Sequence, residues 1–371
     1  MSLPAVVLVG GQGTRLRPLT ERIRKDMLPL VDRPLLAFTF EHLRKHGVRR
    51  GIVSCGYLPT QIEQHFGSAY GDLDLEYRVE EEPLGTAGGI AFAAQGMEET
   101  FFALNGDSLR DADLGEIVKF HRETGAKATI LLTPVADPSR YGLVRLASDG
   151  RVSTFLEKPR PEEIDTNLIN AGVYVLEPEV LSLIPGDRAV SIERDVFPRL
   201  AEEGSVFGLA LDGYWLDVGT PDAYLQAHRD VLERSFSTET GDALGPDFML
   251  VDESAKVHPG ARLVPPVYVG PDAVVEDGAR AGSLAVVGAG AHLARGALVE
   301  NAVIGARVKI GAATAVVGSI VGDDAELGPG CEVRNLGVVG PGAKLGRGNA
   351  LDHGLRIGAD QRIPDLALRF T

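Results

Sequence analysis

The chain has 371 residues, of which 44% are hydrophobic and 24% charged, and its formal net charge is −15. This length predicts about two domains. An acidic chain repels nucleic-acid backbones and anionic membrane surfaces, which argues against both as partners. No stretch approaches the ~18 consecutive apolar residues of a membrane span. With only two cysteines we expect no disulfide framework, and a reducing cytoplasm is the simplest location.

Residues 1–235 alternate short β-branched runs with helical stretches. AVVLV at 5–9 predicts a strand, and residues 35–47 have helical spacing and close on a glycine. Alternating strands and helices indicate an α/β fold with a Rossmann-like, mostly parallel sheet covered on both faces. Ligands in such folds bind beyond the carboxyl ends of the strands. The Gly-rich turn after Val9 and the NGD sequence after Leu104 are therefore candidate ligand sites.

The pattern changes after a polar, Gly- and Pro-bearing stretch at 236–252, which we interpret as a linker. From about Ala255 a six-residue rhythm places a small residue first and an aliphatic residue third, with five-residue slips near Ala302 and Ser319. Three hexads per turn predict a parallel (left-handed) β-helix, with roughly sixteen hexads in about five coils. Disorder, the alternative for so many glycines, needs no regular inward-facing ladder. We therefore expect one domain at 1–235 and a hexapeptide-repeat domain at 253–371.

A Gly-rich segment, GGQGTRLRPLT, follows the first strand from Gly10 to Thr20. Glycines permit a tight turn and let backbone N–H groups approach phosphate oxygens. Arg15 adds a forked cation suited to a triphosphate. The spacing matches neither the dinucleotide fingerprint nor the Walker A motif. Lys25, ten residues further on, can bring a second cation to the same phosphates.

Together with KDMLPLVDRPLL at 25–36, this segment resembles the signature of the sugar-phosphate nucleotidyltransferases, most closely the mannose-1-phosphate guanylyltransferases. One departure is Asp26, because that family commonly has proline after the lysine; Asp26 can either hold Lys25 or weaken it. The resemblance implies transfer of a nucleotidyl group from an NTP, with GTP expected, to a sugar 1-phosphate, with mannose 1-phosphate expected. The products would be an NDP-sugar (GDP-mannose) and pyrophosphate. Two alternatives remain, a glucose-1-phosphate thymidylyl- or uridylyltransferase and a non-catalytic regulatory subunit of such an enzyme.

The loop EEPLGTAGG at 81–89 resembles the family's nucleobase loop, and Glu80 stands where uridylyl and thymidylyl relatives tend to carry glutamine. A carboxylate only accepts hydrogen bonds, and guanine offers two adjacent donors, so Glu80 favours guanine if it reaches the base. The alternative is that Glu80 is one of several solvated carboxylates at 80–82. The nucleotide-binding residues that the resemblance implies are Gly10, Gly11, Gly13, Thr14, Glu80, Gly85 and Thr86.

Asp107 and Asp217 each follow a predicted strand, and the resemblance implies that they share an Mg²⁺ ion. Mg²⁺ suits two carboxylates plus phosphate oxygens, because it keeps several waters. For the sugar phosphate, Glu157 would accept from hydroxyls and Lys158 would meet the phosphate. The sugar-phosphate residues implied are Asn105, Gly142, Glu157, Lys158 and Asn170. Glu193 and Arg194 also lie in a matching segment, but a capped helix start explains them equally well.

The resemblance implies an in-line displacement, in which a sugar-1-phosphate oxygen attacks the α-phosphorus and pyrophosphate leaves. Arg15 and Mg²⁺ would stabilise the leaving pyrophosphate, and Lys25 the α-phosphoryl group, so catalysis rests on positioning and charge neutralisation. The β-helix faces suit subunit contacts, and we expect a homo-oligomer. Since β-helices also serve as acyltransferases, a second activity is a further alternative, with His258, His292 or His353 as its base or as ordinary corner residues.

Overall fold

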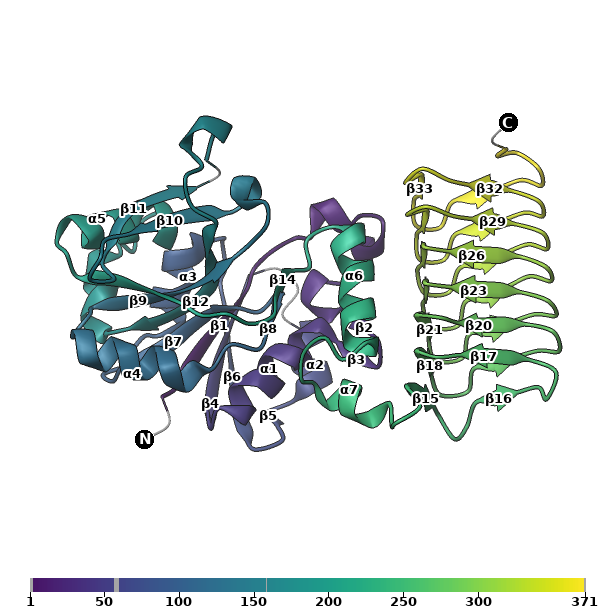
Figure 1. The fold of residues 1–371 in the computed structure, drawn as a ribbon, viewed down its shortest axis with the longest axis horizontal. Helices are drawn as coiled ribbons and strands as arrows, with labels where there is room; N and C mark the ends of the chain where they lie inside the picture. The colour runs from purple at the N-terminus through teal and green to yellow at the C-terminus, as the bar shows by residue number, and fades with distance from the viewer. Residues whose placement is uncertain (1–2, 57–59, 158, 370–371) are drawn as a thin grey trace. The chain divides into compact units, whose positions relative to one another are not determined.

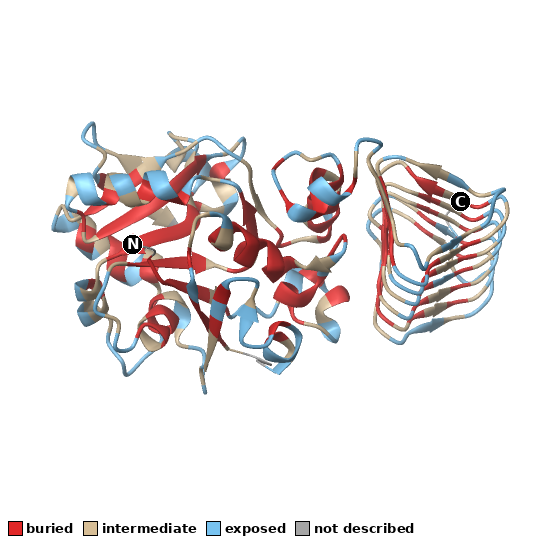
Figure 2. Ribbon diagram, turned by 90° about the horizontal axis from the view of Figure 1, so that it is seen from below, coloured by how far each residue is buried: buried red, intermediate tan, exposed pale blue. Residues whose placement is uncertain are grey.

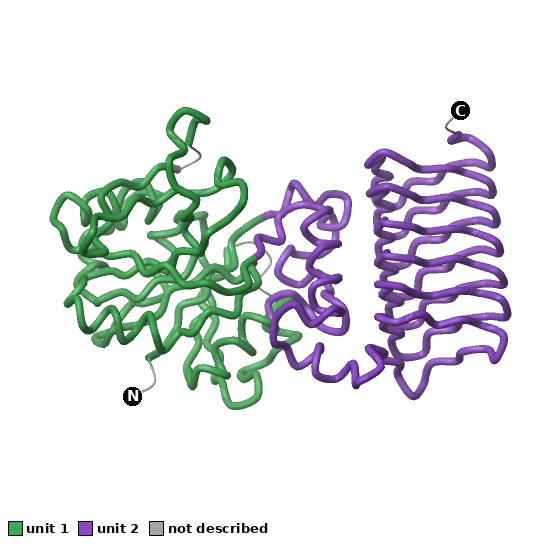
Figure 3. The backbone as a smooth tube through the Cα atoms, in the orientation of Figure 1, with its two compact units in different colours: residues 1–11, 38–215 green, residues 12–37, 216–371 purple. Residues whose placement is uncertain are grey.

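The computed structural model of the chain describes residues 3–56, 60–157 and 159–369. Contacts divide it into two compact units (Figure 3): residues 1–11 with 38–215, and residues 12–37 with 216–371. We call these unit 1 and unit 2. Within the described ranges, no helix is long and apolar enough to cross a membrane.

Unit 1 is built around a mixed sheet whose central strands are parallel. The neighbours β7 (Phe101–Asn105), β1 (Ala5–Val9), β4 (Arg50–Cys55) and β6 (Leu73–Val79) form this centre. Their residues are mostly buried, as Figure 2 shows in red, which explains why AVVLV is continuously apolar rather than alternating. The Rossmann-like, mostly parallel arrangement expected from the sequence is confirmed in this centre.

Antiparallel strands extend the sheet beyond β7. β12 (Leu168–Leu176) pairs with β7, with β10 (Gly142–Leu146) and with β9 (Ala128–Pro134). The remaining strands are β5 (Ala69–Tyr70), β11 (Val152–Glu157) and β13 (Val206–Ala210). The helices of this part of the chain (Figure 1) are α1 (Leu35–Lys45), α2 (Thr60–Phe66), α3 (Gly85–Ala93), α4 (Leu114–Thr124) and α5 (Phe197–Glu202), with single turns η4 (Pro138–Arg140), η5 (Pro161–Glu163), η6 (Pro178–Leu183) and η7 (Ile192–Val196).

Unit 2 begins with short turns and a hairpin. These are η1 (Thr14–Leu16), η2 (Leu19–Glu21), η3 (Lys25–Met27), β2 (Pro29–Leu30) and β3 (Arg33–Pro34). β14 (Trp215–Asp217), which pairs with β8 (Ser108–Arg110), then leads into α6 (Pro221–Leu232). The buried His228 of α6 accepts the Val31 amide proton at its Nδ1, 3.2 Å away, and so supports the hairpin turn, where Val31 has a φ of 60°.

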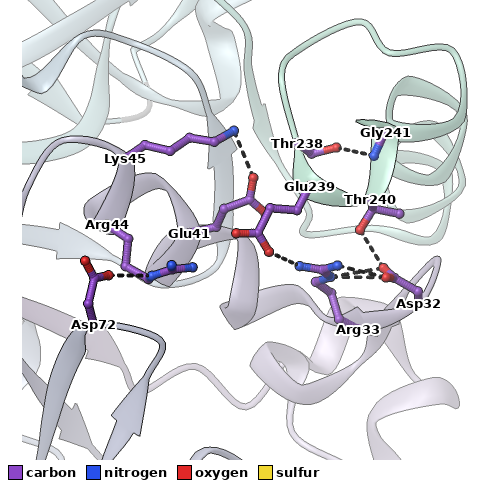
Figure 4. Close-up of polar contacts among 10 residues, drawn as sticks. All are labelled: Asp32, Arg33, Glu41, Arg44, Lys45, Asp72, Thr238, Glu239, Thr240 and Gly241. Carbon is purple, nitrogen blue, oxygen red and sulfur yellow. Dashed lines mark hydrogen bonds and ion pairs between the residues drawn. The ribbon is translucent and has the colours of Figure 1, made fainter. Parts of the chain in front are cut away.

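The stretch interpreted as a linker, 236–252, contains α7 (Glu239–Ala243). Thr238 caps this helix by accepting the Gly241 amide proton at 2.8 Å. α7 is also bonded to the hairpin (Figure 4): Glu239 Oε2 lies 2.7 Å from Arg33 Nη1, and the Thr240 hydroxyl donates to Asp32. These contacts attach the segment before the repeats to the residues that follow Lys25.

The rest of unit 2 is a parallel β-helix, as the hexads predict. Its first sheet contains β15 (Met249–Val251), β18 (Val267–Val269), β21 (Ala285–Val287), β24 (Val303–Ile304), β27 (Ile320–Val321), β30 (Val338–Val339) and β33 (Arg356–Ile357). The second contains β16 (Lys256–Val257), β19 (Val274–Val275), β22 (His292–Leu293), β25 (Lys309–Ile310), β28 (Glu326–Leu327), β31 (Lys344–Leu345) and β34 (Arg362–Ile363). The third contains β17 (Arg262–Val264), β20 (Arg280–Gly282), β23 (Leu298–Glu300), β26 (Ala315–Val317), β29 (Glu332–Val333) and β32 (Ala350–Leu351).

The packing of the β-helix follows the hexad rule. First and third positions, such as Ala273 with Val275 and Ala343 with Leu345, are 0–3% exposed and form one continuous core. Each of the first two sheets has seven strands in the described chain, so the stack is taller than the predicted five coils. The estimate was too low because β15 precedes the sixteen hexads counted from Ala255, and β32, β33 and β34 follow them.

Candidate active site

The two cations of the first loop converge on one carboxylate in unit 2. Lys25 Nζ lies 3.2 Å from Asp217 Oδ1, and Arg15 Nη2 lies 3.5 Å from Asp217 Oδ2. The Lys25 side chain is only 5% exposed, whereas that of Arg15 is 59% exposed. Lys25 is therefore held at a fixed position, while Arg15 extends into solvent, where a polyphosphate can reach it. The structure thus brings both predicted catalytic residues together with one of the predicted metal ligands.

Glycines make this convergence possible. Gly13 has a φ of 59°, and a Cβ there would lie 3.0 Å from the Cβ of Lys25. Gly219 was not predicted from the sequence, although it stands two residues after the predicted metal ligand Asp217. A Cβ at Gly219 would lie 2.5 Å from Arg15 Nη2 and 2.8 Å from Asp217 Oδ2. A side chain at this position would displace the guanidinium or the carboxylate from the other.

The other predicted phosphate-binding positions of the loop are open. Gly10 and Gly11, in unit 1, are exposed, and a Cβ at either would have nothing within 4 Å. Thr14 is exposed at the start of η1, in unit 2. Backbone N–H groups at such positions are accessible to an anion.

Asp26, the departure from the family pattern, has a buried cationic partner. Arg24 Nη2 donates to Asp26 Oδ2 at 2.9 Å, and both side chains are 2% exposed. A buried carboxylate requires such compensation. Arg24 and Asp26 flank Lys25 in sequence, so this ion pair anchors the backbone on either side of Lys25.

Glu80 is bonded to the protein through both of its carboxylate oxygens. Ser54 Oγ donates to Oε1 at 2.9 Å, and the Leu84 amide donates to Oε2 at 3.0 Å. Its neighbours Glu81 and Glu82 are exposed, so Glu80 is not simply one of several solvated carboxylates. Each carboxylate oxygen has a second lone pair, and base recognition by Glu80 stays a prediction.

The start of α3 rests on the segment 190–193. Gly85 has a φ of 74°, and a Cβ there would lie 2.5 Å from the Val190 carbonyl oxygen. The Thr86 hydroxyl donates to Glu193 Oε2 at 2.8 Å and accepts from the Ile192 amide at 2.9 Å. The Thr86 hydroxyl therefore already makes two protein hydrogen bonds, which favours a structural role for it beside the predicted nucleotide contact.

Arg194 and Glu193 belong to a capped helix start, one of the two explanations offered above. The Ser191 hydroxyl accepts the Arg194 amide proton at 3.3 Å and donates to Glu193 Oε2 at 2.6 Å.

Two predicted sugar-phosphate residues meet at the carboxyl end of β7. Asn170 Nδ2 donates to Tyr174 Oη at 2.9 Å, and the Gly172 amide donates to Asn170 Oδ1 at 2.9 Å, across an irregularity in the pairing of β12 with β9. A Cβ at Gly172, where φ is 70°, would lie 2.6 Å from Asn105 Nδ2. Asn105 therefore packs against the irregular turn that Asn170 holds.

Gly142 and Glu157 pair directly across β10 and β11. Both were predicted to bind the sugar phosphate, and this role stays a prediction. Lys158 lies outside the described residues. An aromatic pair nearby in the fold was missed: the Tyr141 and Trp215 rings are edge to face at 5.1 Å, and Trp215 Nε1 donates to the Ala171 carbonyl at 3.0 Å. Tyr141 precedes the predicted Gly142, and Trp215 stands two residues before the predicted Asp217, so their positions were the available signal.

Asp107, the second predicted metal ligand, follows β7 beside a buried arginine. Arg110 is 5% exposed and donates from Nη2 to the carbonyl of Asn105 at 2.6 Å. Burial lowers the pKa of Arg110 to about 10, although the negative charge of Asp107 acts in the opposite direction. Arg110 thus holds the NGD turn, a role that its sequence position did not reveal. Asp107 and Asp217 belong to different units, and their sharing of an ion stays a prediction.

The β-helix histidines proposed as acyltransfer bases make contacts within the repeats. His292 Nε2 lies 2.7 Å from Glu276 Oε1, and His258 Nδ1 accepts from the Gly260 amide at 3.0 Å. His353 has a φ of 51° at a corner. These positions are those of ordinary repeat residues.

Comparisons with known proteins agree with this geometry. Residues 4–234 match the family model described as nucleotidyl transferase, and residues 263–357 match the model described as the GMPPB C-terminal domain. A probable mannose-1-phosphate guanylyltransferase 2 of Oryza sativa subsp. japonica is 37% identical, over 88% of this chain and 92% of the relative. The mannose-1-phosphate guanylyltransferase of Mycobacterium tuberculosis is 39% identical, over 80% of this chain and 83% of the relative.

Other specificities also occur among the relatives. A UTP–glucose-1-phosphate uridylyltransferase of Synechocystis is 33% identical, over 86% of this chain and 87% of the relative. Among solved structures, HddC from Yersinia pseudotuberculosis complexed with GMP-PN is 29% identical, with a TM-score of 0.54 over 61% of this chain and 97% of that chain. The first-loop cation cluster, the Rossmann-like sheet and these matches lead to one conclusion: the chain is a nucleotidyltransferase and belongs to the nucleotidyl transferase family.

Proposed function

We propose that the chain transfers a guanylyl group from GTP to mannose 1-phosphate, giving GDP-mannose and pyrophosphate. The observation that carries the reaction type is the convergence of Arg15 and Lys25 on Asp217. The names of the relatives that match most of the chain support the substrates.

The first loop neutralises the charge that moves during the reaction. The sugar phosphate is already ionised at neutral pH, so its oxygen attacks the α-phosphorus without help from a general base. Arg15, exposed at the end of η1, contacts the departing pyrophosphate through its guanidinium fork. Lys25, nearly buried, meets the α-phosphoryl oxygens, and its pairing with Asp217 keeps the ammonium oriented before substrate binds. Fixed charges of this kind lower the barrier without reorganisation during the reaction.

We further propose Mg²⁺ as the cofactor, with Asp107 and Asp217 as its ligands. The described residues hold no group of three or more His, Cys, Asp or Glu side chains arranged for a metal. Two carboxylates without further protein ligands fit an ion that takes one or two carboxylates and completes its shell with water and phosphate oxygens. When bound, the ion would supply neutralisation of the phosphate charge. Asp217 would help to hold the ion, and Lys25 would remain the cation for the α-phosphoryl group.

Glu80 is proposed as the residue that selects guanine. Ser54 and the Leu84 amide orient its carboxylate, and each oxygen keeps a lone pair for the two adjacent donors of the guanine edge. Uracil presents one donor between two acceptors, which a carboxylate satisfies less well. The uridylyltransferase relative makes glucose-1-phosphate uridylyl transfer the second candidate.

The test is pyrophosphate release with Mg²⁺, crossing GTP, dTTP, UTP, ATP and CTP with mannose and glucose 1-phosphates. Turnover confined to GTP with mannose 1-phosphate supports the proposal, and preference for UTP with glucose 1-phosphate supports the second candidate. Glu80→Gln should lower the GTP-to-UTP ratio of kcat/KM by about tenfold or more, as loss of a charged hydrogen bond does. Glu82→Gln, at a neighbouring exposed position, is the matched control and should leave the ratio unchanged.

Other proposals concern the whole chain. We propose functional boundaries at 1–235 for catalysis, 236–252 for the linker and 253–371 for the β-helix, with self-association through the β-helix. Analytical ultracentrifugation that finds only monomer at micromolar concentration would contradict the homo-oligomer. Cys55 and Cys331 are both buried thiols, which supports a reducing, cytoplasmic location.

A further inference from the structure

One coil near the end of the β-helix contacts the first loop at three points, all within unit 2. Arg356 Nη1 donates to the carbonyl of Arg15 at 2.9 Å and to that of Arg17 at 2.8 Å. The Ala359 amide donates to Glu21 Oε2 at 2.9 Å, and Asp360 pairs with Arg22. Residues 356–360 therefore hold the segment 15–22, more than three hundred residues away in sequence.

This coil continues a packed surface, although Arg356 itself is exposed. In the first β-helix sheet, residues that point away from the interior would ordinarily face water. Four consecutive ones are nonetheless 0–5% exposed: Val286, Val303, Ile320 and Val338. Arg356 is the next in the same column, because it pairs in register with Val338.

The part of unit 2 outside the repeats contacts the β-helix at a second coil, the one that contains Asn301. α6 donates from Arg229 Nε to Asn301 Oδ1, at 2.6 Å. The buried column and the two sets of polar contacts restrict movement of the 356–360 coil relative to the first loop. The β-helix can therefore act as a rigid support for that loop.

The loop is held within its own segment by one short turn and by the fully buried side chain of Leu16, and Arg356 adds contacts to the backbone on both sides of that residue. η1 is a single turn with the backbone hydrogen bonds from Leu16 to Gly13 at 2.9 Å and from Arg17 to Thr14 at 3.3 Å. Most of the Arg15 side chain is exposed, so its direction depends on the backbone from which it projects as well as on its ion pair with Asp217. A displacement of about 1 Å in such a group can reduce catalysis by about 10²-fold.

We propose that Arg356 is a positioning residue for catalysis: by holding the carbonyls of Arg15 and Arg17, it sets the direction of the Arg15 guanidinium. This inference rests on the role proposed above for Arg15. It assigns to the β-helix a part in the catalytic step and not only in assembly.

The chain offers a matched control for the test. Arg362 begins β34 with the same Arg-Ile dipeptide, one hexad later and in the second sheet. Arg356→Ala should lower kcat by about tenfold to hundredfold and leave the KM for the sugar phosphate within about threefold, whereas Arg362→Ala should behave as wild type. Both bonds come from the single Nη1 nitrogen. Arg356→Lys keeps a cationic donor on a shorter side chain, so partial rescue is expected.

A double-mutant cycle separates positioning from general damage. In the Arg15→Ala background, Arg356→Ala should cost less than about twofold further, because its effect passes through Arg15. Multiplicative losses, a wild-type kcat for Arg356→Ala, or an equal loss for Arg362→Ala would overturn the proposal. Equal melting temperatures for Arg356→Ala and Arg362→Ala would exclude loss of fold as the cause.

Amide hydrogen exchange tests the contact without any activity. Peptides covering residues 13–18 should exchange faster in Arg356→Ala than in wild type or Arg362→Ala. Unchanged exchange would refute the support of the loop. Faster exchange in a protein that shows no turnover with any substrate pair would instead locate the failure in the proposed function.

Discussion

Replacing Asp26 by asparagine removes the negative charge that faces Arg24, in a place where both side chains are 2% exposed. The change preserves size and an acceptor oxygen, so its effect reports charge and not packing. Two unit charges ~4 Å apart attract by about 4 kcal/mol at an effective dielectric constant of ~20. Burial of both ions opposes this gain, but removing one partner leaves the other buried and uncompensated, which costs about 3–5 kcal/mol.

The companion variant replaces both charges. Arg24→Met with Asp26→Leu removes the pair and its desolvation cost together, so the double variant should lose less than about 1 kcal/mol relative to wild type. An exposed pair provides the control: Asp149 and Arg151 are about half exposed, and Asp149→Asn should cost about 0–1 kcal/mol. Lys25 lies between Arg24 and Asp26, and so Asp26→Asn should also lower kcat.

Urea denaturation followed by circular dichroism measures these free energies, with hydrogen exchange of peptides around residue 26 assigning the transition to unit 2. Loss of less than about 1 kcal/mol in Asp26→Asn would refute the argument that a buried cation depends on this carboxylate. A double variant as unstable as the two single variants combined would refute it equally.

Three further changes test the site and the fold. Gly85→Ala should cost about 1–3 kcal/mol and weaken NTP binding, because φ is 74° and a backbone oxygen lies 2.5 Å from the new Cβ; Gly186→Ala, in open space, is its control in thermal melting and KM measurements. Arg15→Ala and Lys25→Ala should each lower kcat by about 10²–10³-fold, and a change below tenfold in steady-state assays would contradict the assignment. Burial lowers the pKa of His228 to about 3. Because the unfolded chain binds this proton from about pH 6.5, the unfolding free energy should fall as pH drops from 6.5 toward 3, by up to about 1.4 kcal/mol per unit; denaturation at several pH values should show a shallower slope for His228→Gln.

The β-helix could be predicted because its determinants are local and repeated. Every hexad must place a small residue and an aliphatic residue inside, as Ala273 and Val275 do, and this pattern recurs in each coil. The loop of Gly13 and Arg15 was singled out by its resemblance to a family signature, because its spacing alone matches neither the dinucleotide fingerprint nor the Walker A motif. The pairing of Gly142 with Glu157 is a strand register that the sequence did not predict, and a ligand shared by the two stays a prediction.

What only the tertiary structure decided are the partners of charged and outward-facing groups. Asp217 pairs with Lys25, 192 residues away in sequence, and Gly219 leaves room for Arg15 beside Asp217. From the sequence alone, Asp26 could have weakened Lys25; the structure shows that Asp26 pairs with Arg24. In the repeats, inward positions are specified by the hexad, but an outward valine such as Val338 has the same place in the pattern whether its face is covered or wet. Which face is covered depends on how distant segments fold against it, and no local spacing carries that information.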